Sequence, residues 1–165
     1  LSQQDTDEAV FCFDQILNGY DEEHATVYSP LAYVGMGISY QQAGNFDKAE
    51  FYFSKMPQRL KTMSNNDVDS VWKSLTMLFY TGSFYSATND VETSNMLLQS
   101  LVNLSSARHV TFYVARAKFE MAVNERDTHG KTSDFNELLN DAMAFARFNN
   151  NKHLIMQINT YLKSI

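Results

Sequence analysis

The chain has 165 residues, 44% hydrophobic and 19% charged, a composition typical of a globular domain rather than a disordered segment. Its 6 glycines and 2 prolines are too few for a β protein with many turns, and favour long helices with short connections. A formal net charge of −6 disfavours direct nucleic-acid binding, because phosphate contacts need clustered Lys and Arg. No apolar run approaches the roughly 18 residues of a membrane helix. The only cysteine, Cys12, excludes an internal disulfide and favours a cytoplasmic location.

Residues 4–18 predict an amphipathic helix. Its apolar residues share their spacing with those of a later helix, the two sets being Ala9, Phe13, Ile16 and Ala49, Phe53, Met56. In an array of helix pairs, residues 4–18 then correspond to a second helix, whose first helix would precede Leu1. This favours a fragment of a longer protein. The alternative is an ordinary N-terminal helix packed on its neighbour, because terminal repeats are often atypical.

A polar connector over residues 20–27 is followed by the clearest helix pair, over residues 29–56. Ser29 can cap its first helix, with Pro30 at the first helical position, where the missing N–H costs nothing. Gly44 and Asn45 are expected to end that helix in a turn. Small and aromatic residues alternate at helical spacing through both helices: Tyr33, Met36, Gly37, Tyr40, Phe46, Ala49, Phe53 and Met56. The pattern resembles a tetratricopeptide repeat, in which small residues let two helices approach closely.

A second pair follows a loop at residues 57–67. Its first helix is predicted over residues 68–80 and its second over residues 84–101, with Thr81, Gly82 and Ser83 as the turn. Three residues of this segment have the same spacing as three residues of the earlier pair: Gly82, Phe84 and Ala87 correspond to Gly44, Phe46 and Ala49. The resulting period of 38 to 40 residues exceeds the tetratricopeptide unit of about 34, so the repeats are lengthened and degenerate.

A third pair is predicted to start at Ser106, with a helix to Asn124 and a loop over residues 125–133. Asp134, with Glu137 three residues later, resembles a capping box that opens the next helix. A final helix covers residues 152–165. The sequence therefore predicts an all-α, tetratricopeptide-like solenoid of helical hairpins, a right-handed superhelix of about eight helices forming a single domain over residues 1–165.

Catalytic and metal-binding patterns are not found. None of the four histidines, His24, His109, His129 and His153, lies four residues from another, as a helical metal site requires. The run from Asp21 to His24 is better explained as a solvated polar loop. Cys12 lies between two phenylalanines and is expected to be a buried small hydrophobe rather than a nucleophile. We therefore expect no enzyme activity, no metal and no cofactor.

A concave groove is the remaining candidate for a binding site. In a stack of helix pairs the first helices line the inner surface. Their exposed stripe comprises Val34, Ile38, Gln41 and Gln42, then Trp72, Thr76, Phe79 and Tyr80, then Tyr113, Ala117 and Glu120. Aromatic side chains give apolar contact and amides can bond a peptide backbone, so this mixture favours an extended peptide ligand. The alternative is that Trp72, Phe79 and Tyr113 belong to the core.

Residues 112–165 carry an aromatic-rich helix, a glycine-containing loop, a helix ending in Ala-Phe-Ala-Arg and a closing helix rich in Leu and Ile. With the lengthened repeats and acidic balance, this layout resembles the C-terminal region of Rgg/MutR-type transcription regulators. The resemblance implies a regulatory domain that binds a short peptide pheromone in its groove, as in quorum sensing, and forms dimers. DNA would be contacted only through a helix-turn-helix domain that this chain lacks.

Two further expectations concern partners. The closing helix carries Ile155 and Tyr161 beside its apolar stripe, and these two residues are candidates for a two-fold homodimer interface. The alternative is a monomer in which both residues pack on the preceding helix. The competing function is a constitutive protein–protein interaction scaffold. Its carboxylate-clamp form is disfavoured, because the predicted groove contains no Lys or Arg.

Overall fold

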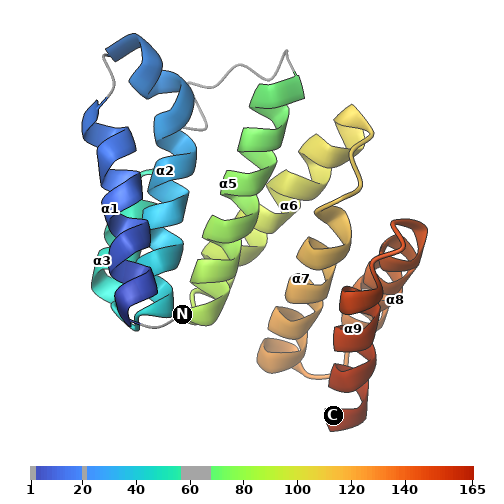
Figure 1. Cartoon of the computed structure of the whole chain (residues 1–165). Coiled ribbons are helices and arrows are strands. Elements are labelled where there is room, and N and C mark those ends of the chain that lie inside the picture. Colours follow the sequence, from blue (N-terminus) through green and yellow to red (C-terminus); the bar gives the residue numbers. More distant parts are fainter. Residues whose placement is uncertain (1–2, 20–21, 57–67) are drawn as a thin grey trace. The chain divides into compact units, whose positions relative to one another are not determined.

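The structure is a computed structural model that describes residues 3–19, 22–56 and 68–165 (Figure 1). This part of the chain contains eight helices and no strand: α1 (Gln3–Gly19), α2 (Glu22–Gln42), α3 (Phe46–Phe53), α5 (Val68–Ala87), α6 (Val91–Arg108), α7 (Val114–His129), α8 (Ser133–Phe148) and α9 (Lys152–Ser164). The all-α prediction and the helix count are confirmed. The chain divides into two compact units, Leu1–Phe84 and Tyr85–Ile165, which are described separately. The superhelical handedness stays a prediction, and the loop predicted at residues 57–67 lies outside the described residues.

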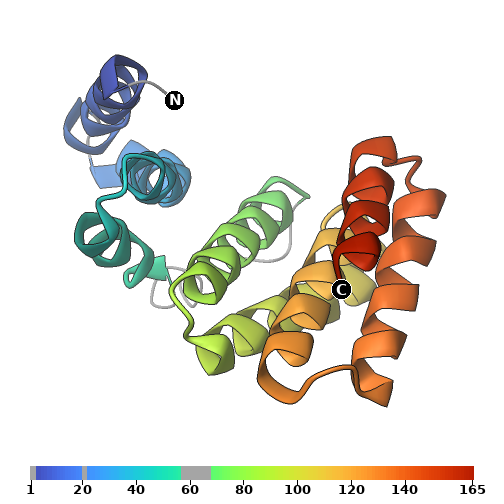
Figure 2. The same ribbon diagram turned by 90° about the horizontal axis from the view of Figure 1, so that it is seen from below.

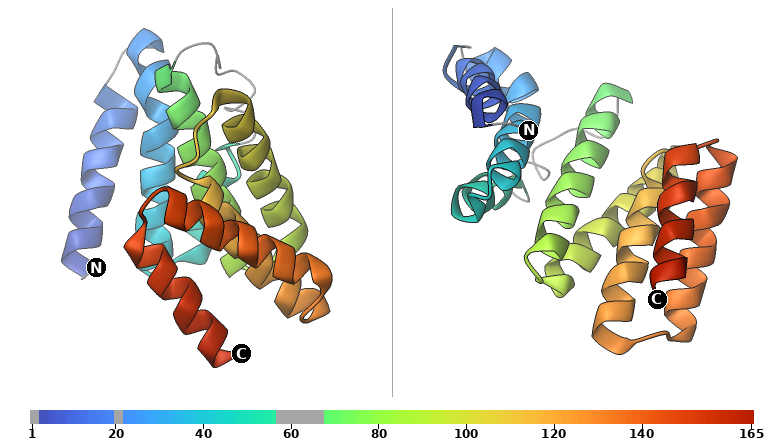
Figure 3. Two further views of the ribbon diagram at one scale, coloured as in Figure 1. Left: turned by 90° about the vertical axis from the view of Figure 1, so that its right-hand side faces the viewer. Right: turned by 60° about the horizontal axis from the view of Figure 1, so that its bottom comes forward.

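In the first unit, α2 packs against both α1 and α3 (Figure 3). Two glycines of α2 make these contacts close. A Cβ atom added at Gly35 would lie 2.3 Å from Cζ of Phe13 on α1, and one added at Gly37 would lie 2.7 Å from Cε2 of Phe53 on α3. The Phe53 ring also stacks on Phe84, with 4.7 Å between ring centroids. The predicted use of small residues against aromatic rings is therefore confirmed for this hairpin.

The start of α2 differs from the prediction. The helix begins at Glu22, so most of the predicted connector is helical and Pro30 lies inside the helix rather than at its first position. An internal proline removes one backbone hydrogen bond and costs on the order of 3 kcal/mol. Ser29 and Pro30 are both buried, and burial of the apolar proline ring opposes this cost. The turn at Gly44 was predicted correctly, and the Asn45 side chain caps α3 by accepting a hydrogen bond from the Lys48 N–H at 3.2 Å.

The second helix pair turns later than predicted. Helix α5 continues through Gly82 to Ala87, and the chain reverses at residues 88–90. A glycine inside a helix costs only about 1 kcal/mol relative to alanine, which does not end a packed helix. The real stop is Asn89, whose φ of 65° is left-handed, followed by Asp90, whose carboxylate accepts from the Thr93 N–H at 3.1 Å.

This correction changes the repeat period to 45 residues. The Asn45 N–H donates to the Tyr40 carbonyl at 2.9 Å, and the Asp90 N–H donates to the Tyr85 carbonyl at the same distance. After each turn, three fully buried residues follow at matching positions. Ala49, Phe53 and Met56 follow the first turn, and Ser94, Leu98 and Leu101 follow the second. Ala87, the residue expected to match Ala49, is the exposed last residue of α5.

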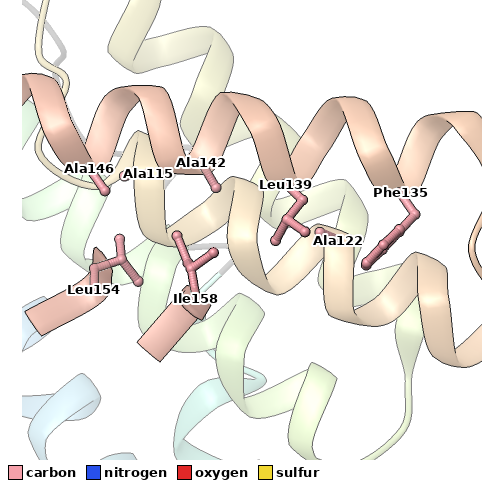
Figure 4. Packing of buried hydrophobic residues seen from close by; sticks show 8 residues of the cluster. All are labelled: Ala115, Ala122, Phe135, Leu139, Ala142, Ala146, Leu154 and Ile158. Carbon is pink, nitrogen blue, oxygen red and sulfur yellow. The ribbon is translucent and has the colours of Figure 1, made fainter. Parts of the chain in front are cut away.

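The second unit contains the end of α5 and helices α6 to α9, with α7, α8 and α9 side by side (Figure 2). Four buried alanines, Ala115, Ala122, Ala142 and Ala146, lie in its core with Phe135, Leu139, Leu154 and Ile158, and Figure 4 shows these side chains between the three helices. Small residues on α7 and α8 allow the close helix approach that the repeat pattern predicts. An ion pair between Lys118 and Asp141, at 2.6 Å, joins α7 to α8 at the edge of this core.

Four further helix boundaries in this unit were predicted wrongly. Helix α6 extends to Arg108 and ends at His109, whose φ is 56°, so α7 begins at Val114 rather than at Ser106. Helix α7 then continues to His129, through most of the predicted loop. The N-cap of α8 is Thr132 rather than Asp134, because the Thr132 hydroxyl accepts from the Phe135 N–H at 3.0 Å. The final helix, α9, agrees with the prediction to one residue.

A buried amide fixes α7 against α6. The Asn124 side chain is 4% exposed and accepts from the Ser86 hydroxyl at 2.7 Å. Its amide N–H groups donate to Ser94 at 3.1 Å and to Asn95 at 2.9 Å. All of its polar atoms are thus bonded, which is the condition under which a buried amide stabilises a single packing register.

Candidate functional site

The predicted groove residues divide between core and surface. In the first unit Val34 and Phe79 are 3% and 5% exposed, and in the second unit Ala117 is fully buried. These three are core residues, so the assignment of their side chains to an open groove is corrected. The alternative that Trp72, Phe79 and Tyr113 belong to the core holds for Phe79 alone, because Trp72 is exposed and Tyr113 is half-buried. The remaining first-unit positions are half-buried Ile38, Gln41, Thr76 and Tyr80, with Gln42 and Trp72 exposed; Tyr113 and Glu120 in the second unit are half-buried.

The predicted dimer residues contact their own unit. Ile155 and Tyr161 are half-buried and pack against the core between α7, α8 and α9. The Tyr161 ring meets Phe119 edge-on, with 5.5 Å between centroids. Burial, with a smaller contribution from the negative charge of Asp127, raises the pKa of the Tyr161 hydroxyl. Part of each side chain remains exposed, so self-association through them stays a prediction.

A groove between α8 and α9 is the candidate site within the second unit. It has a volume of about 390 Å³, within the range of about 300–1,000 Å³ typical of ligand sites. Its lining comprises Asn136, Leu139, Asn140, Met143, Ala144 and Arg147 from α8, with Ile158, Asn159 and Leu162 from α9. We call this surface the amide groove.

The sequence positions the amide groove through helical periodicity and one turn. Asn136, Asn140 and Arg147 share a face of α8, because residues four and seven apart are neighbours on a helix. The chain reverses at Asn150, whose φ is 51°, and the Asn151 side chain caps α9 by accepting from the Leu154 N–H at 3.1 Å. As a result α9 runs back along α8 (Figures 1 and 2).

Two hydrogen bonds hold this turn from outside. The Thr111 hydroxyl donates to the Asn149 side-chain oxygen at 2.8 Å, and the Asn149 amide donates back to the Thr111 carbonyl at 3.0 Å. The loop before α7 thereby supports the end of the groove nearest Arg147. A site supported on rigid elements in this way needs little reordering when it binds.

The polar groups of the groove are largely unpaired. Asn136 donates to the Thr132 carbonyl at 2.8 Å. Within the described residues, the side chains of Asn140, Asn159 and Arg147 make no hydrogen bond or ion pair. Leu139 and Ile158, which are 6% and 0% exposed, provide an apolar floor beneath them. The groove therefore offers two free amides and one free guanidinium above a hydrophobic base, an arrangement that can hold a polar main chain.

Sequence reasoning missed this groove because it looked for binding residues on the first helices of the pairs. The amide groove lies instead on α8, a second helix, and on α9. A detectable signal was present: asparagines four residues apart with an arginine seven residues later form a polar stripe beside the apolar residues of α8. Such a stripe on its own is more often a solvated face, and only the position of α9 makes it one wall of a groove.

The cysteine, histidine and acidic side chains of the described residues do not line the amide groove. Cys12 is exposed rather than buried, which corrects its interpretation as a core residue. Among the described residues no group of three or more His, Cys, Asp or Glu side chains can hold a metal ion. His129 contacts Glu125 at 2.9 Å, and the run from Asp21 to His24 lies outside the residues whose side chains the structure describes. No helix in the described part of the chain is long and apolar enough to cross a membrane.

Comparison with known proteins gives no relative from which a function can be transferred. No family model, no curated protein and no solved structure matches the chain.

Proposed function

We propose that this chain is a peptide-binding helical domain that holds an extended peptide in the amide groove. The observation that carries the proposal is the set of unpaired side chains, Asn140, Asn159 and Arg147, above the apolar floor of Leu139 and Ile158. A side-chain amide has both a donor and an acceptor, so it can bond either the N–H or the C=O group of a peptide. Met143 and Leu162, which also line the groove and keep part of their surface exposed, provide apolar contact for alternate side chains of the same peptide.

An extended peptide fits this lining better than a partner helix does. The backbone groups of a helix are bonded within the helix, so it would cover the groove amides without pairing them. Each buried polar group left unpaired costs roughly 1–3 kcal/mol. An extended segment instead presents free N–H and C=O groups along its length, which makes it the favoured occupant.

The resemblance to Rgg/MutR-type regulators suggests a cellular role for this peptide binding. In that role the chain is the regulatory, peptide-sensing and dimerising domain of a cytoplasmic bacterial transcription regulator, with DNA bound by a separate domain. The second candidate is a constitutive protein–protein interaction scaffold, favoured by the rigid support of the groove. A helix-turn-helix encoded ahead of this chain would support the regulator, whereas additional helix pairs there would support the scaffold.

The proposal is tested with a library of capped, randomised hexapeptides passed over the immobilised chain. Retained peptides are identified by mass spectrometry, resynthesised and titrated by calorimetry. Asn140→Ala and Asn159→Ala should each weaken binding about three- to tenfold, which corresponds to the loss of one hydrogen bond of about 1 kcal/mol. Both residues are exposed, so the melting temperature should stay unchanged.

Gln157→Ala is the matched control. Gln157 is an exposed amide of α9 that does not line the groove, so its removal should leave the dissociation constant unchanged. If the immobilised chain retained none of the library peptides, the proposal would be contradicted. Equal losses for Gln157→Ala and Asn159→Ala would place the binding surface elsewhere.

A further inference from the structure

The charge of the chain is distributed unevenly along its length. Residues 142–165 contain Arg147, Lys152 and Lys163 but none of the 19 Asp and Glu residues, although the net charge of the whole chain is −6. This acid-free segment includes all of α9 and the end of α8 that carries Arg147. Six of the nine residues that line the amide groove, from Met143 to Leu162, belong to this acid-free segment, which reduces the repulsion that an acidic ligand meets there.

Among the described residues, Arg147 is the only charged one that lines the groove, and no carboxylate lines it. In the described structure its guanidinium is exposed and has no ion-pair partner. The acidic residues of α8 do not enter the groove, and Asp141 is already paired with Lys118. A guanidinium presents a planar fork of donors that matches a carboxylate with two parallel hydrogen bonds.

We propose that the amide groove selects acidic peptides, with one Asp or Glu side chain of an extended peptide bound to Arg147 and the peptide main chain bound to Asn140 and Asn159. This inference rests on the proposed function and names the ligand class of the same site. A nucleic acid is disfavoured, because one cation is too few to bind a polyanion.

The groove length sets the size of the bound segment. Eleven helical positions separate Asn136 from Arg147, which corresponds to about 16 Å at 1.5 Å per residue. An extended peptide rises about 3.3 Å per residue, so roughly five residues span this distance. The bound segment is therefore short, and the acidic side chain lies toward the end of the groove formed by the α8–α9 turn.

The test uses the hexapeptide library, whose capped ends carry no terminal carboxylate. Sequencing of the retained pool should show enrichment of Asp and Glu over their input frequency. A retained acidic peptide, resynthesised with Gln in place of Glu or Asn in place of Asp, should bind at least about tenfold more weakly at low salt. Arg147→Gln should abolish that difference while leaving the affinity for the amide peptide unchanged.

Three controls separate charge at the site from general attraction. Lys163→Gln removes a charge from α9 outside the groove lining and should preserve the preference for the acidic peptide. A neutral peptide with a free C-terminus tests whether the groove binds a terminal carboxylate instead of an acidic side chain. This peptide should bind no better than its amidated form. A single-stranded oligonucleotide should not compete for the groove.

The outcomes distinguish the two proposals. Equal affinity of acidic and amide peptides, both weakened by Asn140→Ala, would overturn the acidic preference and retain peptide binding. If Arg147→Gln leaves the preference intact, the binding of the acidic side chain to Arg147 is overturned and peptide binding is retained. Tighter binding of the free C-terminus than of the acidic side chain, or competition by the oligonucleotide, would also overturn the acidic preference. Failure of every library peptide to bind would overturn both proposals together.

Discussion

Gly37 shows how one residue fixes the distance between two helices. A Cβ atom at this position would lie 2.7 Å from Cε2 of Phe53, a ring that is fully buried and already stacked on Phe84. The ring cannot move away, because the protein interior is close-packed. The same principle was visible in the sequence, which predicted small residues where aromatic rings cross.

Gly37→Ala should therefore destabilise the first unit by roughly 1–3 kcal/mol through overpacking. The single tryptophan, Trp72, lies in the first unit, so its fluorescence can follow urea unfolding of that unit. Gly19→Ala is the matched control, since a Cβ there meets nothing within 4 Å and should be neutral or slightly stabilising. Equal unfolding midpoints for Gly37→Ala and Gly19→Ala would show that the ring can give way.

The limits of sequence prediction are also visible in single residues. Ala49, Phe53 and Met56 were predicted as an interface stripe, and all three are fully buried. Gly82 was predicted as a turn and is instead buried in α5, because tertiary packing outweighed its weak helix propensity. Asn89 and Asp90 carried the correct signal, a left-handed residue followed by an N-cap, which a search for glycine alone does not detect.

At the scale of elements, one carboxylate joins the end of α7 to the start of α8. Glu125 accepts from the Thr132 hydroxyl at 2.8 Å and contacts the His129 ring at 2.9 Å. Thr132 in turn caps α8 through the Phe135 N–H. These two hydrogen bonds, with Thr132 the larger contribution, lower the pKa of Glu125 below its ordinary value of 4.5.

A lowered carboxyl pKa predicts a loss of stability in acid. The folded unit favours the charged carboxylate, so the stabilisation is present above pH 4.5 and is lost as the pH falls through the lower pKa of the folded state. Amide hydrogen exchange across residues 114–148 should therefore accelerate on acidification more in the wild type than in Glu125→Gln, after correction for intrinsic exchange rates. Glu137→Gln, on the exposed side of α8, is the control and should behave like the wild type. If Glu125→Gln and the wild type were equally sensitive to acid, the Glu125 carboxylate would not be a source of the stability lost in acid.

The packing partner of each helix, which the sequence does not specify, explains why the candidate site escaped prediction. The sequence predicted α8 and α9 well, yet it placed the binding surface on the first helices, where Val34, Phe79 and Ala117 prove to be core. Periodicity identifies which face of a helix is apolar, but not which neighbour covers it. The amide groove depends on that neighbour, since Asn140 and Arg147 form a site only where Asn159 lies across from them.

At the scale of the whole molecule, the remaining question is whether two copies of the chain associate. Ile155 and Tyr161 pack on their own core but keep part of their surface exposed. A two-fold interface places the same patch of each copy against itself, so this residual apolar surface can be buried twice in one contact.

Sedimentation equilibrium at micromolar concentration should then give about twice the chain mass of 18.9 kDa. Ile155→Asp and Tyr161→Asp should shift the protein toward the monomer, because an unpaired charge in an apolar interface is strongly unfavourable. Both variants also disturb the core of the second unit, so circular dichroism must first establish that they fold. Met156→Asp provides the matched control: Met156 is 60% exposed on α9 and lies outside the proposed interface, so the dimer should persist. A monomer of 18.9 kDa for the unmodified chain would reject the interface, and a dimer insensitive to both substitutions would locate it on another surface.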